Sequence, residues 1–158
     1  MEFLNFEINE KTFRNIAIGI GIIIIIYMAF TMNSLVVLKS YSLGATTSVN
    51  DEEIRTHIDS LDVGQKKIEI TGYAYKEGES IESVDSYFVL KNQDNEKMYL
   101  MKTVMEKKQE LKEIGCENAG LHAQCMLFGL PKGRYQIMVL YRNNNEDILA
   151  DTLIPFEI

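Results

Sequence analysis

The clearest hydropathy feature of the chain is an apolar, uncharged run over residues 16–38, which includes five consecutive isoleucines at 22–26. As a helix rising about 1.5 Å per residue, a run of this length would reach roughly 34 Å, enough for a hydrocarbon core of about 30 Å. A helix also satisfies every backbone N–H and C=O internally, as a bilayer requires. The pattern therefore predicts a transmembrane helix over residues 16–38.

Two other interpretations of this run stay open. A cleaved signal peptide usually has a shorter apolar region, of about 7–15 residues, followed by a small-x-small cleavage site. Here the cleavage candidate, near residues 42–45, is poor. A helix buried in a soluble protein would need apolar cover all round, which a small domain supplies with difficulty. We favour the membrane span.

Beyond residue 66 the pattern changes to a period of two. Ile68 and Ile70 alternate with Lys67 and Glu69, as in a half-buried strand. Further strands are predicted at 86–92, 97–103, 122–130, 134–143 and 147–158, separated by polar turns. The 134–143 strand is apolar on both faces at its centre, which predicts a central strand covered on both sides. Pro155 favours an edge or a bulge in the last strand.

Two segments are ambiguous. Residues 51–64 place Ile54, Ile58 and Leu61 at helical spacing, with Asn50 or Asp51 as a cap, but an extended reading fits almost as well. Residues 104–115 combine helix formers with a weak apolar stripe, which is typical of a short helix or a charged surface loop.

The predicted fold class is a single N-terminal transmembrane helix plus an all-β domain, an antiparallel Ig-like β-sandwich of six or seven strands. We expect four parts: a cytoplasmic tail over 1–15, the span over 16–38, a stalk over 39–56 and the extracytoplasmic sandwich over 57–158. Lys11 and Arg14 precede the span, so the positive-inside bias places the N-terminus in the cytoplasm and the domain outside.

Charge limits the partners of the exported part. From residue 40 onward, 13 Lys and Arg oppose 20 Asp and Glu, a net charge of −7. Such a surface repels phosphate backbones, so nucleic acid is not expected as a partner. The integral partner is the bilayer itself.

The two cysteines, Cys116 and Cys125, lie beyond the span, where an oxidising compartment favours a disulfide. Free thiols are an alternative. A metal site with His122 between them is a third, although it lacks a fourth ligand. The expectation is a local disulfide, with no metal and no cofactor.

Catalytic motifs are not found in the sequence, which contains no GxSxG, HExxH or phosphate loop. A nucleophile pair of Cys125 and His122 is disfavoured because residues three apart on a strand point to opposite faces. The acidic clusters fit a solvated surface better than a calcium site. We therefore expect no enzymatic activity.

Two sets of residues could make contacts. Four tyrosines are candidates for stacking on a glycan, with packing into the core as the alternative: Tyr73, Tyr75, Tyr99 and Tyr141. In the span, Ala17, Gly19 and Gly21 form a notch of small residues that would let another helix approach closely.

Four stretches of the exported part resemble Ig-like β-sandwich modules of Gram-positive bacterial cell-surface proteins. They are HIDSLDVGQKKIEITGYAY (57–75), SYFVLKN (86–92), AGLHAQC (119–125) and GLPKGRYQIMVLYRNNNEDILADT (129–152). Such modules open with a hydrophobic-Ile-Asp-Ser segment and an IxGxA strand, and end in an L-x-x-G-x-Y-x-I hairpin. The chain departs at Tyr73, where tryptophan is commoner, and at Leu61, where proline is usual. The resemblance implies an envelope role beside polysaccharide-handling proteins and no transferable activity.

The leading hypothesis is a non-enzymatic, single-pass accessory protein whose domain binds another envelope membrane protein, or a second copy of itself. The alternative is a membrane-anchored glycan-binding module for cell-wall or capsular polysaccharide. Exposed tyrosines clustered on one sheet face would favour the alternative. A charged or apolar patch free of aromatic residues would favour the leading hypothesis.

Overall fold

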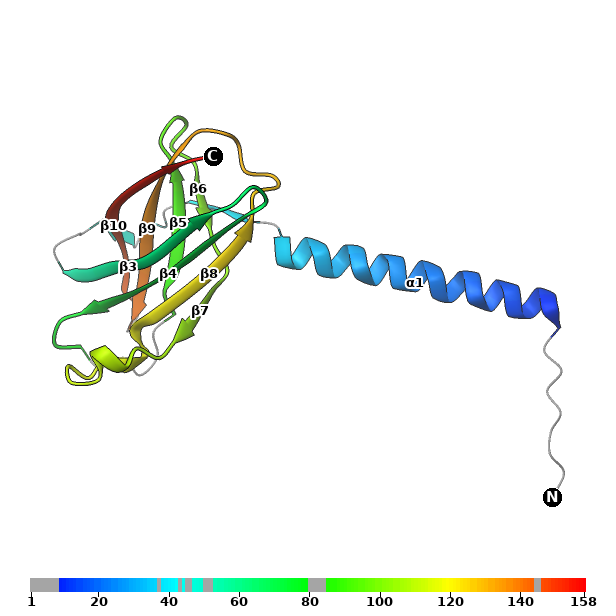
Figure 1. Cartoon of the computed structure of the whole chain (residues 1–158), viewed down its shortest axis with the longest axis horizontal. Helices are drawn as coiled ribbons and strands as arrows, with labels where there is room; N and C mark the ends of the chain where they lie inside the picture. Colours follow the sequence, from blue (N-terminus) through cyan, green and yellow to red (C-terminus); the bar gives the residue numbers. More distant parts are fainter. Residues whose placement is uncertain are drawn as a thin grey trace, which may run out of the picture. The chain divides into compact units, whose positions relative to one another are not determined.

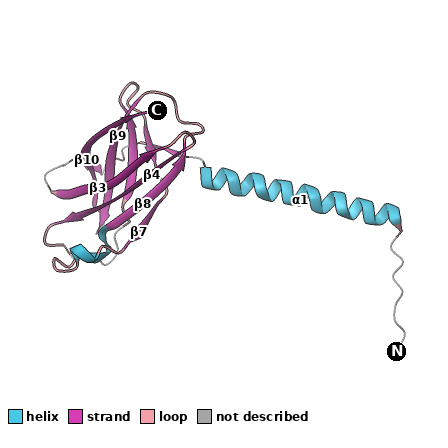
Figure 2. Cartoon of the chain, in the orientation of Figure 1, coloured by secondary structure: helices cyan, strands magenta, loops and turns pink. Residues whose placement is uncertain are grey.

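The computed structural model describes residues 9–36, 38–42, 44, 47–49, 53–79, 85–143 and 146–158. The chain divides into two compact units, Met1–Val36 and Val37–Ile158. The first contains a helix, and the second consists almost wholly of strands (Figure 1, Figure 2). Each unit is described by itself.

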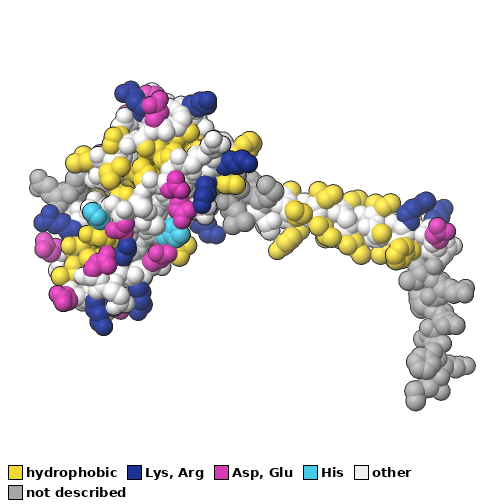
Figure 3. Space-filling model, viewed as in Figure 1, with side chains coloured by type: hydrophobic (Ala, Val, Ile, Leu, Met, Phe, Trp, Pro, Cys, Tyr) yellow, Lys and Arg dark blue, Asp and Glu magenta, His cyan; other side chains and the backbone are white. Residues whose placement is uncertain are grey.

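The first unit is helix α1, which spans Glu10–Val36. Its start is capped by Asn9, whose Oδ1 accepts a hydrogen bond from the Lys11 backbone N–H at 3.0 Å. The isoleucine side chains between positions 16 and 26 are 50% to 67% exposed, and apolar groups line the visible surface of the helix (Figure 3). The predicted apolar helix is thus confirmed. Among the described residues it is the one helix long and apolar enough to cross a membrane, by length and composition.

The helix begins before the predicted boundary. Glu10, Lys11 and Arg14 were expected in a separate tail, yet they lie in its first turns. The reason is that a helix is defined by backbone hydrogen bonds, which continue from an apolar run into a polar one. Residues 1–8 of the predicted tail lie outside the described residues.

The second unit contains two sheets. The six-stranded sheet has the order β1-β6-β5-β9-β10-β2 and the four-stranded sheet the order β3-β4-β8-β7. The strands of the first, in sheet order, are Lys39–Tyr41, Met98–Leu100, Tyr87–Asn92, Arg134–Asn143, Glu146–Glu157 and Thr47–Val49. Those of the second are Ile54–Val63, Lys67–Lys76, Gly120–Met126 and Thr103–Glu106. Neighbouring strands are antiparallel, except that β2 runs parallel to β10.

The two sheets pack against each other through one apolar core. On β4, Ile68 and Ile70 are fully buried while the residues between them are half-buried, which confirms the predicted alternation. Phe88 and Ile137 contribute to the same core from the six-stranded sheet. The all-β, antiparallel and sandwich-like character of the domain is therefore confirmed.

Strand β9 is central and covered on both sides, as its sequence predicts. Ile137 and Val139 face the core between the sheets. Met138 and Leu140 belong to a second apolar cluster with Val89 and Leu149. Because these residues alternate with the core residues, this cluster lies on the outer face of the six-stranded sheet.

The ambiguous segment 51–64 contains a strand where it is described, not a helix. Strand β3 pairs with β4 along its length, with a bulge between Ile58 and Ser60. The bulge brings the chains so close that a Cβ on Gly72 would lie 2.2 Å from the His57 carbonyl oxygen. Glycine is needed there because any larger residue would collide with the backbone. The cap proposed at Asn50 or Asp51 lies outside the described residues.

Residues 104–115 were predicted as a helix or a loop, and neither describes them fully. The first of them complete strand β7, and a single 3₁₀ turn, η1, follows at Gln109–Leu111. A second 3₁₀ turn, η2, spans Glu117–Ala119. Pairing with β8 overrides the helix propensity of the segment because edge pairing supplies backbone hydrogen bonds.

The stalk predicted over 39–56 is wrong for its described residues. Strand β1 pairs with β6, and β2 pairs with β10 at the opposite edge. Strand β3 already begins at Ile54. The small, polar composition that suggested a spacer is also compatible with short edge strands, which are often polar.

The bulge predicted from Pro155 is present just before it. The register between β10 and β9 shifts between Asp151 and Ile154, and Leu153 has a φ of +59°. Strand β2 covers only residues 147–149 of β10, so Pro155 lies where no described strand pairs with its free side. A proline therefore costs no hydrogen bond of the ladder.

Candidate binding face on the four-stranded sheet

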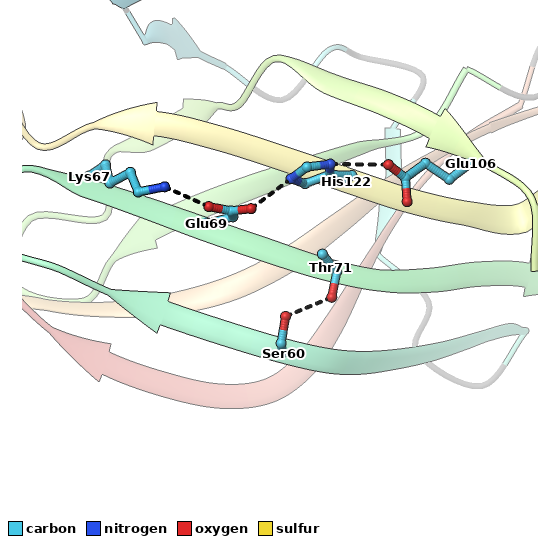
Figure 4. A network of polar contacts seen from close by, with 6 residues as sticks. All are labelled: Ser60, Lys67, Glu69, Thr71, Glu106 and His122. Carbon is cyan, nitrogen blue, oxygen red and sulfur yellow. Dashed lines mark hydrogen bonds and ion pairs between the residues drawn. The ribbon is translucent and has the colours of Figure 1, made fainter.

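The outer face of the four-stranded sheet carries an ordered set of polar side chains. The alternation of β4 buries Ile68 and Ile70 and turns Glu69 and Thr71 outward. The same alternation on β8 turns His122 outward. We call six of these residues the polar face: Ser60, Lys67, Glu69, Thr71, Glu106 and His122 (Figure 4).

His122 lies between two carboxylates that come from neighbouring strands. Its Nε2 is 3.1 Å from Glu69 Oε1 on β4, and its Nδ1 is 3.1 Å from Glu106 Oε1 on β7. An imidazolium can donate to both carboxylates at once, whereas a neutral ring can donate to one. The contacts link three adjacent strands through a single ring (Figure 4).

Lys67 extends this network. Its Nζ donates to Glu69 Oε2 at 2.8 Å. This hydrogen bond, together with that from His122, lowers the pKa of Glu69, and Glu69 in turn raises the pKa of Lys67. Glu69 is thus held ionised. A neutral hydrogen bond of 2.7 Å between the Ser60 and Thr71 hydroxyls lies beside the charged groups.

A second ion pair borders the polar face. Lys108, just after β7, binds Asp59 in the bulge of β3, which raises the pKa of Lys108. The bulge adds a residue to β3 and so re-aims a side chain on this face. His57 lies 3.8 Å from the same Asp59.

Aromatic rings occupy the part of this sheet face next to η1 and η2. The ring centroid of Tyr73 is 5.2 Å from that of His57 and 6.1 Å from that of Tyr75. We call these three residues the aromatic row. Tyr73 and Tyr75 are half-buried and pack against Leu111, Cys116 and Ala119. Burial and the neighbouring Tyr75 raise the pKa of Tyr73.

The other two tyrosines proposed for glycan stacking lie elsewhere. Tyr141 is 1% exposed in the core between the sheets. Tyr99 packs against the same core, with its ring centroid 6.4 Å from that of Tyr135. The structure therefore brings together Tyr73 and Tyr75 but not the set of four.

The predicted disulfide between Cys116 and Cys125 is wrong, because both residues are buried free thiols. Cys125 on β8 faces the core between the sheets. Cys116 packs against Tyr73 and Tyr75 on the other face of the same sheet. The sheet thus separates the two side chains. Short sequence separation suggested proximity, but Cys116 precedes η2 and lies outside β8, whereas Cys125 points into the core from β8.

The small residues of α1 are surrounded by open space. A Cβ on Gly19 or Gly21 would meet no atom within 4 Å, and Ala17 is exposed. Packing of this notch against another helix stays a prediction.

Metal and nucleophile chemistry find little support on the polar face. Among the residues that the structure describes, no group of three His, Cys, Asp or Glu could hold a metal ion. The two carboxylates beside His122 contact opposite nitrogens of the ring, so one ion could not be bound by all three residues. Cys125 is buried on the inner side of β8 while His122 is half-buried on the outer side, and burial raises the Cys125 pKa to about 11.

The sequence reading missed the partners of His122. The alternation predicts Glu69 on the polar side of a strand, and Glu106 falls in the segment predicted as a short helix or a charged surface loop. Only the register of β4, β8 and β7 brings them to one ring. The alternation along the strand predicts that Glu69 points outward, but it does not predict which residues of other strands lie beside it.

No family model, no curated protein and no solved structure matches this chain. The fold and the geometry of the polar face therefore support the functional proposal by themselves.

Proposed function

We propose that the protein is a non-enzymatic, single-pass membrane protein whose β domain binds another protein of the cell envelope through the polar face. The observation that carries this proposal is the network of Lys67, Glu69, His122 and Glu106. Their side chains are 32% to 49% exposed, so charged groups are held in fixed positions yet stay available to a partner. Such charges give specificity to an interface.

The anchor part of the proposal is supported by α1. Within Glu10–Ala29 an 18-residue window has a mean hydropathy of 1.9, and none of that window is buried. Apolar side chains without protein cover suit lipid. Lys11 and Arg14 at its start favour a cytoplasmic N-terminus. Protease added to intact cells should then degrade the domain after Lys39, and protection of the domain until lysis would contradict this orientation.

The strand order supports an immunoglobulin-like domain. In a constant-type immunoglobulin sandwich, strands A, B, E and D form one sheet and C, F and G the other. When the strands from β3 onward are lettered along the chain, with β6 left out, the sheet β3-β4-β8-β7 corresponds to A-B-E-D and the strands β5-β9-β10 to C-F-G. Strand β6 lies beyond β5. Tyr135 at the start of β9 donates to the Pro131 carbonyl oxygen at 2.7 Å, as a tyrosine corner does. These features support the immunoglobulin-like part of the resemblance, and the place beside polysaccharide-handling proteins rests on the resemblance alone.

The binding proposal is tested by purifying the full-length chain from its cells in mild detergent and identifying what co-purifies. Glu106→Lys reverses a charge on the polar face, at a side chain that is 49% exposed. Glu157→Lys makes the same change at an exposed residue of β10, in the other sheet. We expect a protein partner with the wild type and with Glu157→Lys, and its loss with Glu106→Lys. Equal recovery with both variants would contradict the polar face as the contact.

A second candidate function is glycan binding, and the aromatic row favours it. Three rings from adjacent strands lie side by side, and the His57 side chain is 58% exposed. Stacked rings could hold a sugar face. The half-burial of Tyr73 and Tyr75 beneath η1 and η2 leaves less ring surface for this purpose.

The two functions are separated by matched variants. If the function is binding to a protein, the wild type, His57→Ala and Tyr75→Ala should not differ in binding of the detergent-purified chain to isolated cell-wall polysaccharide. Loss of polysaccharide binding in these variants, with partner recovery unchanged, would establish the glycan function instead.

A further inference from the structure

The loop between β8 and β9 presents an aromatic side chain to solvent. Residues 127–130 form a turn closed by a 3.1 Å hydrogen bond from the Leu130 backbone N–H to the Leu127 carbonyl oxygen. Gly129 at the third position has a φ of +91°, the conformation that a type II turn requires there. Phe128 occupies the second position and is 87% exposed, the highest value among the large hydrophobic side chains that the structure describes.

The base of this turn is fixed to the domain. The Leu127 backbone N–H donates to the Lys66 carbonyl oxygen at 2.9 Å. Leu127 and Leu130 pack against the core, and the tyrosine corner from Tyr135 holds Pro131. Phe128 therefore projects from a supported turn while its two apolar neighbours point inward. Figure 1 shows this loop at the same end of the domain as the turn between β3 and β4.

Two lysine side chains lie near the turn that carries Phe128. Lys66 and Lys132 are exposed on the two sides of the turn, and neither forms an ion pair with another described residue. The acidic residues at this end are partly neutralised, because Asp94 pairs with Arg134 and Glu96 with Lys91. Asp62 and Glu157 also lie toward this end, opposite Glu69 and Arg134 in their strand pairs.

We propose that the turn at Phe128 inserts into the surface of a lipid bilayer, with Lys66 and Lys132 lying against anionic headgroups. An aromatic residue at a membrane interface buries its ring among the acyl chains, and flanking lysines are attracted by negative lipid. This inference rests on the proposed anchor, because α1 would hold the domain beside the bilayer. Apart from these two lysines, residues 40–158 carry a net negative charge, which disfavours unspecific contact of the whole domain with anionic lipid.

Tryptophan fluorescence tests the proposal, since the chain contains no tryptophan. Full-length Phe128→Trp is reconstituted into vesicles of phosphatidylcholine and phosphatidylglycerol, with lipids brominated in their acyl chains as quenchers. We expect emission shifted to shorter wavelength and quenched by the brominated lipid. Lys66→Glu combined with Lys132→Glu should reduce both effects, as should replacing the anionic lipid with neutral lipid.

Leu153→Trp is the matched control, because Leu153 is 79% exposed at the bulge of β10. Its emission should resemble that of tryptophan in water and resist quenching. Equal quenching at both positions would overturn a contact specific to the loop. An unquenched Phe128→Trp whose emission shifts only when envelope proteins are added would assign the turn to a protein partner.

Flotation of the wild-type chain with the vesicles separates the two proposals. A chain that floats but shows no quenching at position 128 overturns the loop contact and leaves the anchor intact. A chain that does not float overturns the anchor, and the loop contact as stated falls with it.

Discussion

The outer faces of the two sheets differ in what they expose. On the four-stranded sheet, Glu69 and His122 are about one-third exposed and joined by hydrogen bonds. On the six-stranded sheet, Val89, Leu140 and Leu149 at corresponding outward positions are 0% to 1% exposed. The first face carries a charged network, whereas the second has an apolar layer bordered by ion pairs such as Arg142–Asp147.

We propose that the two faces serve different tasks. Burial of Leu140 and its neighbours stabilises the fold and removes these side chains from contact with a partner. Surface ion pairs, by contrast, contribute little to stability, typically about 0–1 kcal/mol. An ordered network such as that around His122 is therefore better explained by recognition than by stability.

The largest expected effect comes from the apolar outer layer. Leu140→Ala should lower the free energy of unfolding by about 2–5 kcal/mol, because it removes a fully buried side chain and leaves a cavity. Leu90→Ala, on the inner face of the same sheet and also 0% exposed, should cost a similar amount. Urea unfolding followed by circular dichroism measures both. A loss under about 1 kcal/mol for Leu140→Ala alone would mean that the outer layer is not packed like a core.

The next effect concerns the two faces of β8 and its neighbours. Burial raises the pKa of the Cys125 thiol from 9.0 to about 11, and burial also raises the pKa of Cys116. At pH 8 the reactive thiolate of Cys125 should therefore be about 100-fold scarcer than in an unfolded chain. Mass spectrometry after iodoacetamide should find slow labelling of the folded domain. Both cysteines should label after denaturation without a reductant, and a need for reductant would contradict the free thiols.

A smaller effect tests the connection between the sheets. Tyr135→Phe removes the hydrogen bond to Pro131, which should cost about 0.5–1.5 kcal/mol. Tyr99→Phe, a hydroxyl deletion on a half-buried ring beside Tyr135, is the control. The midpoint temperature of thermal unfolding should be lower for Tyr135→Phe than for the control. Identical midpoints would show that the corner does not fix the loop.

The smallest effect is on pH dependence. The pKa of Glu69 is lowered, so its ion pair contributes stability above the ordinary value of 4.5, and this is lost as pH falls through the folded value. Glu69→Gln should therefore lower stability slightly at pH 6 and flatten its decline in acid. Asp94→Asn, at a carboxyl whose pKa is lowered by Arg134 on the other sheet, should act similarly and additively. An acid decline unchanged in Glu69→Gln, measured by urea unfolding from pH 6 to 3, would contradict the network.

Local patterns in the sequence predict much of the fold. The apolar run predicts α1, and the alternation of Ile68 and Ile70 predicts β4 and its inward face. The bounds predicted for the long strand match β9, Arg134–Asn143. These features depend on residues that are close in sequence, so local patterns can predict them.

Features that depend on the pairing of distant strands cannot be predicted from local sequence patterns. The short strands β1 and β2 exist through pairing with distant edges. The separation of Cys116 from Cys125 depends on the face that each residue occupies, and the meeting of Glu69, His122 and Glu106 depends on three strands being aligned. A single sequence predicts which side chains share one face of a strand, but it does not predict which strands lie side by side.

We propose that the polar face, and not the outer face of the six-stranded sheet, contacts a protein partner. This claim is tested most directly by photo-crosslinking in living cells, with a photoreactive phenylalanine derivative placed at Val104. This residue is 58% exposed and opposite His122 on β7. The same group placed at Lys91, on the outer face of the six-stranded sheet, is the control. We predict a discrete protein adduct from position 104 and none from 91, and an adduct from 91 alone would contradict the claim.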